Sequence, residues 1–215
     1  MALPFTHDAF LDVFGRYNTT LWPVVLILWL ATAWVAWRWI RTGRVRGRVL
    51  FGLLAVHWAW SGIVYHWIYF RLINPAATLF AAAFAVEAVL LGWLAATSRG
   101  HVVTGAKRRR MIGGALVVYG LAYPLLGFVF GLSYPRLPLF AVPCPTTLVT
   151  AGWLIASARI PRVVSLVPML WAIVGSSAAV TLGIRADLAL VVAAAFLMLD
   201  VLAPSALGDR AARSR

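Results

Sequence analysis

The sequence predicts an all-α polytopic membrane protein with seven transmembrane helices. First, 63% of its 215 residues are hydrophobic and only 12% are charged. Second, the apolar residues form long continuous runs, and a helix needs about 20 such residues to cross a bilayer. Third, the basic residues gather between alternate runs. A transmembrane β-barrel is not favoured, because its strands would show short segments of alternating polarity.

Residues 1–18, which precede the first apolar run, have the pattern of a helix that lies on the outer face of the membrane that the protein crosses. Thr6 is suited to cap its first turn, and Phe10, Leu11 and Phe14 fall on one side. An apolar side of this kind favours an interfacial amphipathic helix. A frayed terminus is the alternative that the same residues leave open.

Seven apolar runs follow and form one transmembrane domain over residues 19–206. The fifth run is the shortest, so the sequence does not define its ends. The expected helices lie near 19–40, 49–70, 76–97, 111–132, 145–159, 163–183 and 187–206. A basic tail over residues 207–215 comes after them and is expected in the cytoplasm.

The distribution of basic residues predicts the orientation. Fifteen of the 19 lysine and arginine residues lie in or beside the connections that follow odd-numbered runs. The other connections hold only Arg16, Arg71, Arg136 and Arg185. Cytoplasmic loops carry the excess of basic residues, so the N-terminus is expected outside and the C-terminus inside. The predicted location is the bacterial inner membrane, which the chain crosses several times.

The net charge of +13 does not indicate nucleic-acid binding, because the basic residues are divided among short connections between apolar runs. The densest cluster is Lys107, Arg108, Arg109 and Arg110. Such a cluster is expected to meet anionic lipid head groups. The lipid bilayer and an unknown small molecule are the expected partners, and the oligomeric state stays open, a homo-oligomer included.

The outer connection over residues 133–147 is rich in proline, which cannot continue a helix. A stiff surface loop is the favoured interpretation. Packing against the helices is the alternative, because the connection also contains apolar residues such as Leu137 and Phe140. Cys144, the single cysteine, is expected to be a small packed residue rather than a nucleophile, since no acid or histidine is close to it in sequence.

The chain shows signs of an internal duplication. Trp58-Ala59 recurs as Trp171-Ala172, and Ala81–Phe84 recurs as Ala193–Phe196, at offsets of 113 and 112 residues. The halves would cover about 19–97 and 145–206, with 111–132 as a linker helix. By architecture alone, this plan of three helices, one and three is similar to SWEET sugar transporters and opsins. Substrates of repeat-built transporters bind near the midplane, between the halves.

Two carboxylates and a histidine lie inside the apolar runs. Glu87 is near the middle of the third run, Asp200 is in the seventh and His57 is in the second. Charged groups in a membrane are costly and mark functional sites by default. We therefore expect a substrate or proton pathway at these three residues, although protonated acids with a structural role are the alternative. Trp58 and Trp171 are candidates to flank a ligand there.

A second polar set is expected near the outer face, where it would form a vestibule for a polar or anionic solute. A structural role is the alternative for most of its members, and an interfacial position in an aromatic belt is favoured for the histidine. The set consists of Asn18, His66, Asn74, Tyr134, Arg136 and Asp187.

Several motifs carry a resemblance to a known family. LPFTHDAFLDVFGRYN followed by Trp22-Pro23, INPAA at 73–77, YPLLG at 123–127 and PCPTT at 143–147 resemble the pattern of a family of uncharacterised bacterial integral membrane proteins. The resemblance covers most of the chain. It implies a membrane location and no activity, because the family has none assigned.

The sequence favours a small-solute transporter or channel, with proton coupling through the midplane carboxylates. A ligand-binding, lipid-binding or accessory protein is the first alternative, and a lipid-modifying enzyme is less favoured. No catalytic residue, metal ligand or cofactor is expected. A retinal-binding photoreceptor is excluded, because the only lysine, Lys107, lies in a connection and cannot form the Schiff base inside the bundle.

Overall fold

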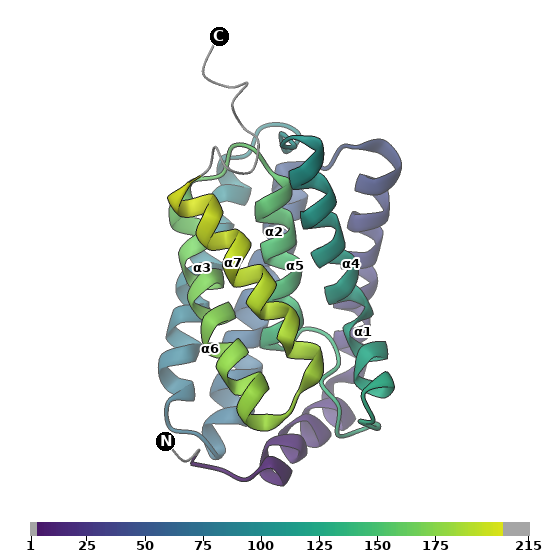
Figure 1. Ribbon diagram of the computed structural model, residues 1–215, viewed down its shortest axis with the longest axis vertical. Helices are drawn as coiled ribbons and strands as arrows, with labels where there is room; N and C mark the ends of the chain where they lie inside the picture. Colours follow the sequence, from purple (N-terminus) through teal and green to yellow (C-terminus); the bar gives the residue numbers. More distant parts are fainter. Residues whose placement is uncertain (1–3, 204–215) are drawn as a thin grey trace.

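Within the described residues, seven α-helices run up and down between the two ends of the molecule (Figure 1). The computed structural model describes residues 4–203, so the expected basic tail at 207–215 lies outside the described residues. The helices are α1 (His7–Thr42), α2 (Gly47–Trp60), α3 (Ala77–Thr97), α4 (Lys107–Val129), α5 (Pro143–Ala156), α6 (Leu166–Leu182) and α7 (Ala189–Leu202). Shorter helical turns are the π-helix η1 (Ser61–Tyr69) and the 3₁₀ turns η2 (Phe70–Leu72), η3 (Arg162–Ser165) and η4 (Arg185–Leu188).

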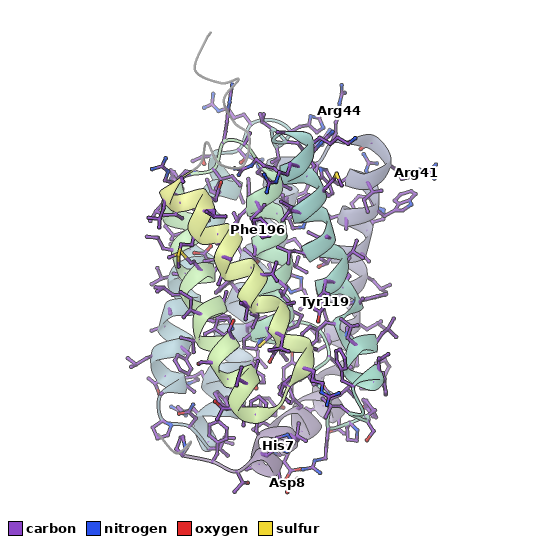
Figure 2. All side chains as sticks on the ribbon, in the orientation of Figure 1. His7, Asp8, Arg41, Arg44, Tyr119 and Phe196 are labelled. Atoms are coloured by element: carbon purple, nitrogen blue, oxygen red, sulfur yellow. The ribbon has the colours of Figure 1, made fainter. Side chains whose placement is uncertain are left out.

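The two ends of the bundle differ in charge, as the sequence predicts. His7 and Asp8 lie at one end, which we call the amino-terminal end, and Arg41 and Arg44 lie at the other, which we call the basic end (Figure 2). The chain reverses direction at every helix, so the basic connections of the described range all reach the basic end.

Five helical segments are long and apolar enough to cross a membrane: α1, α2 with η1 and η2, α3, α4, and η3 with α6. In contrast, α5 has 14 residues, which at about 1.5 Å per residue is roughly 21 Å and therefore less than the ~30 Å hydrocarbon core. The seventh helix, η4 with α7, has 4 and 14 residues and carries three charged side chains, Arg185, Asp187 and Asp200. The structure thus supports a helical membrane protein, whereas seven complete spans stay a prediction.

Helix α1 is longer than predicted. It runs unbroken from His7 to Thr42, so residues 7–18 are continuous with the first predicted run and do not form a separate segment. Thr6 caps the helix as expected, because its Oγ1 accepts a hydrogen bond from the amide of Ala9 at 3.1 Å. The first turns cross the amino-terminal end of the bundle (Figure 1). Phe14 is buried there against the ring of Tyr65, 5.5 Å away, so this apolar side packs on protein.

Helix α5 forms the centre of the bundle. All of its residues except Cys144 are buried, and it contacts α2, α4, α6 and α7. Its approach to α4 depends on glycine: a β-carbon at Gly113 or Gly152 would overlap the other residue's carbonyl oxygen. Close contact through small residues is how helices pack in membranes. The fifth predicted run is therefore a short enclosed helix.

The chain before α5 enters the bundle, and we call residues 137–142 the inserted segment. Leu137, Phe140, Ala141 and Val142 are at most 1% exposed, and the Phe140 ring lies 5.2 Å from the ring of His57 in α2. The favoured interpretation of a stiff surface loop is thus wrong, and the alternative of packing against the helices is confirmed. The cause is the apolar character of this proline-rich stretch, whose burial removes apolar surface from water.

Side chains satisfy the carbonyl groups of this irregular chain. Asn18 Nδ2 donates to the carbonyl oxygens of Pro135 and Leu137, at 2.7 Å in both cases. The carbonyl oxygen of Ala141 accepts hydrogen bonds from Tyr17 Oη at 3.2 Å and from Ser61 Oγ at 3.1 Å. Irregular backbone at membrane depth is tolerated only where protein or water supplies such partners. Asn18 therefore has a structural role, as a support for the inserted segment.

The connection from α3 to α4 closes the basic end. It pairs with the turn between α1 and α2, because Val102 N donates to Val45 O at 2.9 Å. On its other side, Gly105 N donates to Ala156 O at 2.8 Å, at the end of α5. These backbone bonds tie three neighbouring connections into one cap.

The structure does not support the predicted internal repeat. The second span, α2 with η1 and η2, has 26 residues, but its proposed counterpart, η3 with α6, has 21. The matched tryptophans also have different surroundings. Trp58 donates to Thr150 Oγ1 at 2.9 Å, while Trp171 contacts the ring of His66. Alanine-rich helices resemble one another in sequence because few residue types suit a lipid environment.

Candidate functional site

A cavity of about 190 Å³ lies near the amino-terminal end of the bundle, and we call it the His66 cavity. The first turns of α1, the end of the second span, the inserted segment and helices α3 to α6 contribute to its walls. Its wall is mostly aromatic and apolar. The polar lining residues are Tyr65, His66, Asn74, Tyr123, Cys144, Trp171, Ser177, Thr181 and Asp187.

His66 lines this cavity and has no internal partner. It is 0% exposed, and neither of its ring nitrogens makes a hydrogen bond to any residue in the described range. The rings of Phe84 and Trp171 lie 4.7 and 4.9 Å from its own. Buried polar groups are nearly always hydrogen-bonded. The imidazole is therefore a group that a molecule in the cavity would satisfy.

The expectation that His66 belongs to an interfacial aromatic belt is wrong. The π-helix η1 contains the residue, and a π-helix turns less per residue than an α-helix. Positions on a regular helical wheel therefore do not give the direction of His66. The side chain enters the protein between α3 and α6, whose Phe80 and Trp171 rings it contacts.

Asp187 forms the acidic side of the cavity. It is 5% exposed, and its Oδ1 accepts a hydrogen bond from Tyr123 Oη. The thiol of Cys144, in the first turn of α5, also lies against this carboxylate. The turn η4 holds Asp187 in place because Tyr119 Oη, on α4, donates to the carbonyl oxygen of Ala186 at 2.9 Å.

Trp171 lines the cavity, but Trp58 does not. The ring of Phe84 lies between the two, 4.3 Å from Trp58 and 5.0 Å from Trp171. The two tryptophans therefore do not flank an open space. Trp171 Nε1 is buried without a hydrogen bond to any described residue and lies beside the Cys144 sulfur.

The remaining members of the predicted vestibule occupy different places. Asn74 lines the cavity, and its Oδ1 accepts a hydrogen bond from the amide of Ala76 at 3.1 Å, just before α3. Tyr134 is 51% exposed and lines a separate apolar groove of about 490 Å³ between α1 and α4. The structure therefore brings together only His66, Asn74 and Asp187.

Arg136 lies at the surface of the amino-terminal end, away from the cavity lining. Its Nη2 donates to Asp8 Oδ1 at 2.8 Å, and its Nε lies 2.9 Å from Asp12 Oδ1. The hydrogen bond to Asp8 raises the pKa of the Arg136 guanidinium above its ordinary value, and Asp12 adds to this effect. These contacts join the outer connection to the first turns of α1.

His57 and Glu87 are buried in the middle of the bundle, at 1% and 0% exposure. His57 Nε2 is hydrogen-bonded to Thr32 Oγ1 at 2.8 Å, and its Nδ1 has no partner in the described part of the chain. Neither carboxylate oxygen of Glu87 has a hydrogen-bond partner among the same residues. The two side chains are thus not joined by a direct hydrogen bond.

Asp200 lies at the basic end, where it forms an ion pair with Arg109. The distance from Arg109 Nη1 to Asp200 Oδ1 is 2.6 Å. Arg109 also donates to the carbonyl oxygens of Ile155 at 2.9 Å and Ser157 at 2.8 Å. Asp200 therefore joins α7 to α4 and α5, and does not stand beside Glu87 as an unpaired acid.

Arg109 consequently departs from its predicted role. Its side chain is 2% exposed, so the expectation that all four residues of the basic cluster meet lipid head groups is wrong for this one. Lys107, Arg108 and Arg110 are exposed at the basic end. A helical turn of four basic residues has one inward position, and Asp200 occupies the space beside it.

Sequence reasoning missed Tyr123 and Cys144 as partners of Asp187. They are separated from Asp187 by 64 and 43 positions in the chain, so spacing gave no indication of the contact. A signal did exist, because Tyr123 is in the YPLLG motif and Cys144 is in the PCPTT motif. In the part of the chain that the structure describes, no group of three or more His, Cys, Asp or Glu side chains is arranged to hold a metal ion.

Comparison with known proteins gives one match. The model of a family described as a family of unknown function, DUF6064, matches residues 7–209. This agrees with the resemblance to an uncharacterised family, although it does not test the four motifs one by one. No curated protein and no solved structure matches the chain.

Proposed function

We propose a function from the His66 cavity alone, because this chain belongs to DUF6064, a family of unknown function that supplies no activity to transfer. The proposed function is small-solute transport across the membrane, with the solute bound in the His66 cavity. One observation carries the proposal: a fully buried imidazole faces this cavity, and none of the described residues forms a hydrogen bond with either of its nitrogens. Leaving such groups unpaired costs about 1–3 kcal/mol each, and a bound polar solute would recover that free energy.

The shape of α5 supports transport over a purely structural role. A short helix begins inside the protein at Pro143, directly after the inserted segment, and both contribute to the cavity wall. Many transporters bind their substrates where a discontinuous helix begins within the membrane. The basic end would face the cytoplasm and the cavity would lie toward the outer side.

Glu87 is the proposed carrier of a coupling proton. No described residue forms a hydrogen bond with this carboxyl group. A carboxylate without such a partner is very costly to bury as an anion, so the neutral acid is favoured. Gain and loss of this proton would require water or movement during transport. The proposal does not extend to Asp200, because its pairing with Arg109 gives it a structural role.

The test is solute-driven flux into proteoliposomes, with a trapped pH dye to report protons. Ala178, which lines the cavity, is replaced with Phe to fill it. The matched control is Ala96→Phe on the exposed side of α3. We expect flux of at least one solute in wild type and in the control, and its loss in Ala178→Phe. Equal flux in both variants would mean that the solute does not pass through this cavity.

Glu87→Gln tests proton coupling separately. The amide keeps the size of the side chain but cannot exchange a proton at neutral pH. We expect solute uptake to continue down a gradient while the accompanying acidification disappears. Unchanged acidification in a variant that folds like wild type would remove Glu87 from the proton pathway.

The apolar groove between α1 and α4 favours lipid binding as a second candidate function. It is lined by Trp22, Leu26 and Leu125, which are 45–66% exposed, and Tyr134 lies beside them. Lipid extracted from purified protein would be compared between wild type and Leu26→Trp, which narrows the groove. Retention of a specific lipid by wild type alone, together with no flux for any solute, would favour this candidate over transport.

A further inference from the structure

We propose that the His66 cavity selects a small organic ammonium compound that also carries an oxygen acceptor. This inference rests on the proposed function, because it names the substrate class of the same site. Three independent features lead to it: the charge of the wall, its aromatic side chains and its unsatisfied nitrogens.

The charge of the wall favours a cation. Among residues 4–203, which the structure describes, Asp187 is the one acidic residue that lines the cavity, and no lysine or arginine lines it. Tyr123 and Cys144 contact the carboxylate, but such neutral groups do not cancel its charge. An anionic solute would therefore meet a carboxylate with no compensating cation. Electrostatic interactions are stronger in a low-dielectric interior than in water, so this difference is large.

The start of α5 does not reverse this preference. A helix N-terminus carries about half a positive charge and attracts anions. Here the carboxylate of Asp187 already lies against the first turn, at Cys144. Prolines at positions 143 and 145 also remove two of the amide donors that would hold an anion. The net charge at this side of the cavity stays negative.

The aromatic side chains suit an ammonium group. Phe70, Phe80, Tyr65, Tyr123 and Trp171 line the cavity together with rings from the first turns of α1. The face of an aromatic ring attracts a cation, and quaternary ammonium groups are recognised in this way. A wall of many rings and one carboxylate therefore matches an ammonium ion, which combines apolar surface with a positive charge.

The unsatisfied nitrogens require an oxygen on the same molecule. Trp171 Nε1–H is a donor, and a neutral His66 supplies one donor and one acceptor. A purely hydrocarbon cation would leave these groups unpaired. A hydroxyl group can both accept and donate, so it satisfies them. A cavity of about 190 Å³ holds roughly six groups of the size of a water molecule, at about 30 Å³ each, which fits a short amino alcohol.

The test compares two ammonium probes, choline and ethanolamine, with the neutral isostere of choline, in which a carbon atom replaces the ammonium nitrogen. Binding is measured by calorimetry on the full chain in phosphatidylglycerol nanodiscs. We expect at least one ammonium probe to bind about tenfold or more tightly than the isostere. Because this comparison uses wild-type protein, it does not depend on the folding of any variant.

Variants then locate the binding site. We expect Asp187→Asn and Trp171→Leu to weaken binding about tenfold. The matched controls are Asp8→Asn, a carboxylate at the surface, and Trp58→Phe, a buried indole outside the cavity. Both controls should bind like wild type. Equal weakening in a control and in its cavity variant would overturn the assignment to this cavity.

A lipid head group could supply the same chemistry as a free solute. Nanodiscs that contain phosphatidylcholine or phosphatidylethanolamine distinguish the two sources: competition with the free probes identifies the head group, and unchanged affinity identifies the soluble compound.

An isostere that binds as tightly as choline would overturn the ammonium class and leave the cavity as a solute site. If neither ammonium probe binds, the inference fails; if, in addition, no solute is transported, the proposed function fails with it.

Discussion

Arg109 and Asp200 show how a side chain in a basic cluster acquires a structural role. Arg109 is almost fully buried, and its guanidinium donates to two carbonyl groups and to the Asp200 carboxylate. The ion pair joins α4 to α7 beside the end of α5. Removing one partner of such a buried pair leaves a charge or a set of carbonyl groups without compensation.

We therefore expect Arg109→Ala to lower the free energy of unfolding by about 3–5 kcal/mol. Asp200→Asn should cost less, because Arg109 keeps its bonds to Ile155 and Ser157. Thermal unfolding in detergent measures both, with Arg110→Ala as the exposed control. A loss of transport in Asp200→Asn without a loss of stability would return Asp200 to the solute or proton pathway.

Single residues were harder to predict than helices, for a physical reason. The cost of burying a charge marks Asp200 and Glu87 in the sequence, but it does not identify their partners. Asp200 forms an ion pair with Arg109, which lies 91 positions earlier in the chain. Glu87 has no hydrogen-bond partner among the described residues. The sequence placed His66 among polar residues near the outer face. Its burial depends on the π-helix η1, which no sequence pattern predicted.

At the scale of elements, the inserted segment depends on Asn18. Asn18→Leu has a similar volume but cannot donate to the carbonyl oxygens of Pro135 and Leu137. We expect a loss of about 1–3 kcal/mol for each unsatisfied group, with faster hydrogen exchange over residues 135–142. Thr19→Val, at an exposed neighbouring position, should have little effect. Unchanged exchange in Asn18→Leu would show that other contacts hold the segment.

The contact between α4 and α5 should be equally sensitive to one added carbon. In Gly152→Ala the β-carbon would overlap Gly113, so we expect a loss of about 1–3 kcal/mol in unfolding free energy. Gly92→Ala, in α3, meets no neighbouring atom and should stabilise the protein by about 0.5–1 kcal/mol. Opposite shifts of the unfolding temperature would confirm this packing, and a destabilising Gly92→Ala would contradict it.

The sequence predicted seven helices and the alternation of their directions, because apolar runs and basic connections are strong local signals. The prediction was wrong for segments whose apolar side chains are buried in protein rather than in lipid. The inserted segment and α5 contain the same apolar residue types as a span, so composition does not distinguish the two environments. The start of the first helix at Thr6 was expected, but its continuity with the first apolar run was not, because residues 7–18 have the pattern of a separate surface helix.

At the scale of the whole molecule, the charge difference between the ends predicts the topology. In a Cys144→Ser background, Tyr134→Cys at the amino-terminal end should react with a membrane-impermeant maleimide added to intact cells. Arg99→Cys at the basic end should react only after the cells are lysed. The reverse labelling pattern would place the basic end outside and contradict the proposed orientation.

The enclosed position of α5 has a consequence for synthesis. The ribosome makes α5 before α6 and α7, two of the helices that later surround it. Until they emerge, the carbonyl groups of the inserted segment depend on α1 and the second span, and one side of α5 faces lipid or the translocon. Insertion therefore has to precede assembly, and a chain truncated after α5 should be a substrate for membrane quality-control proteases.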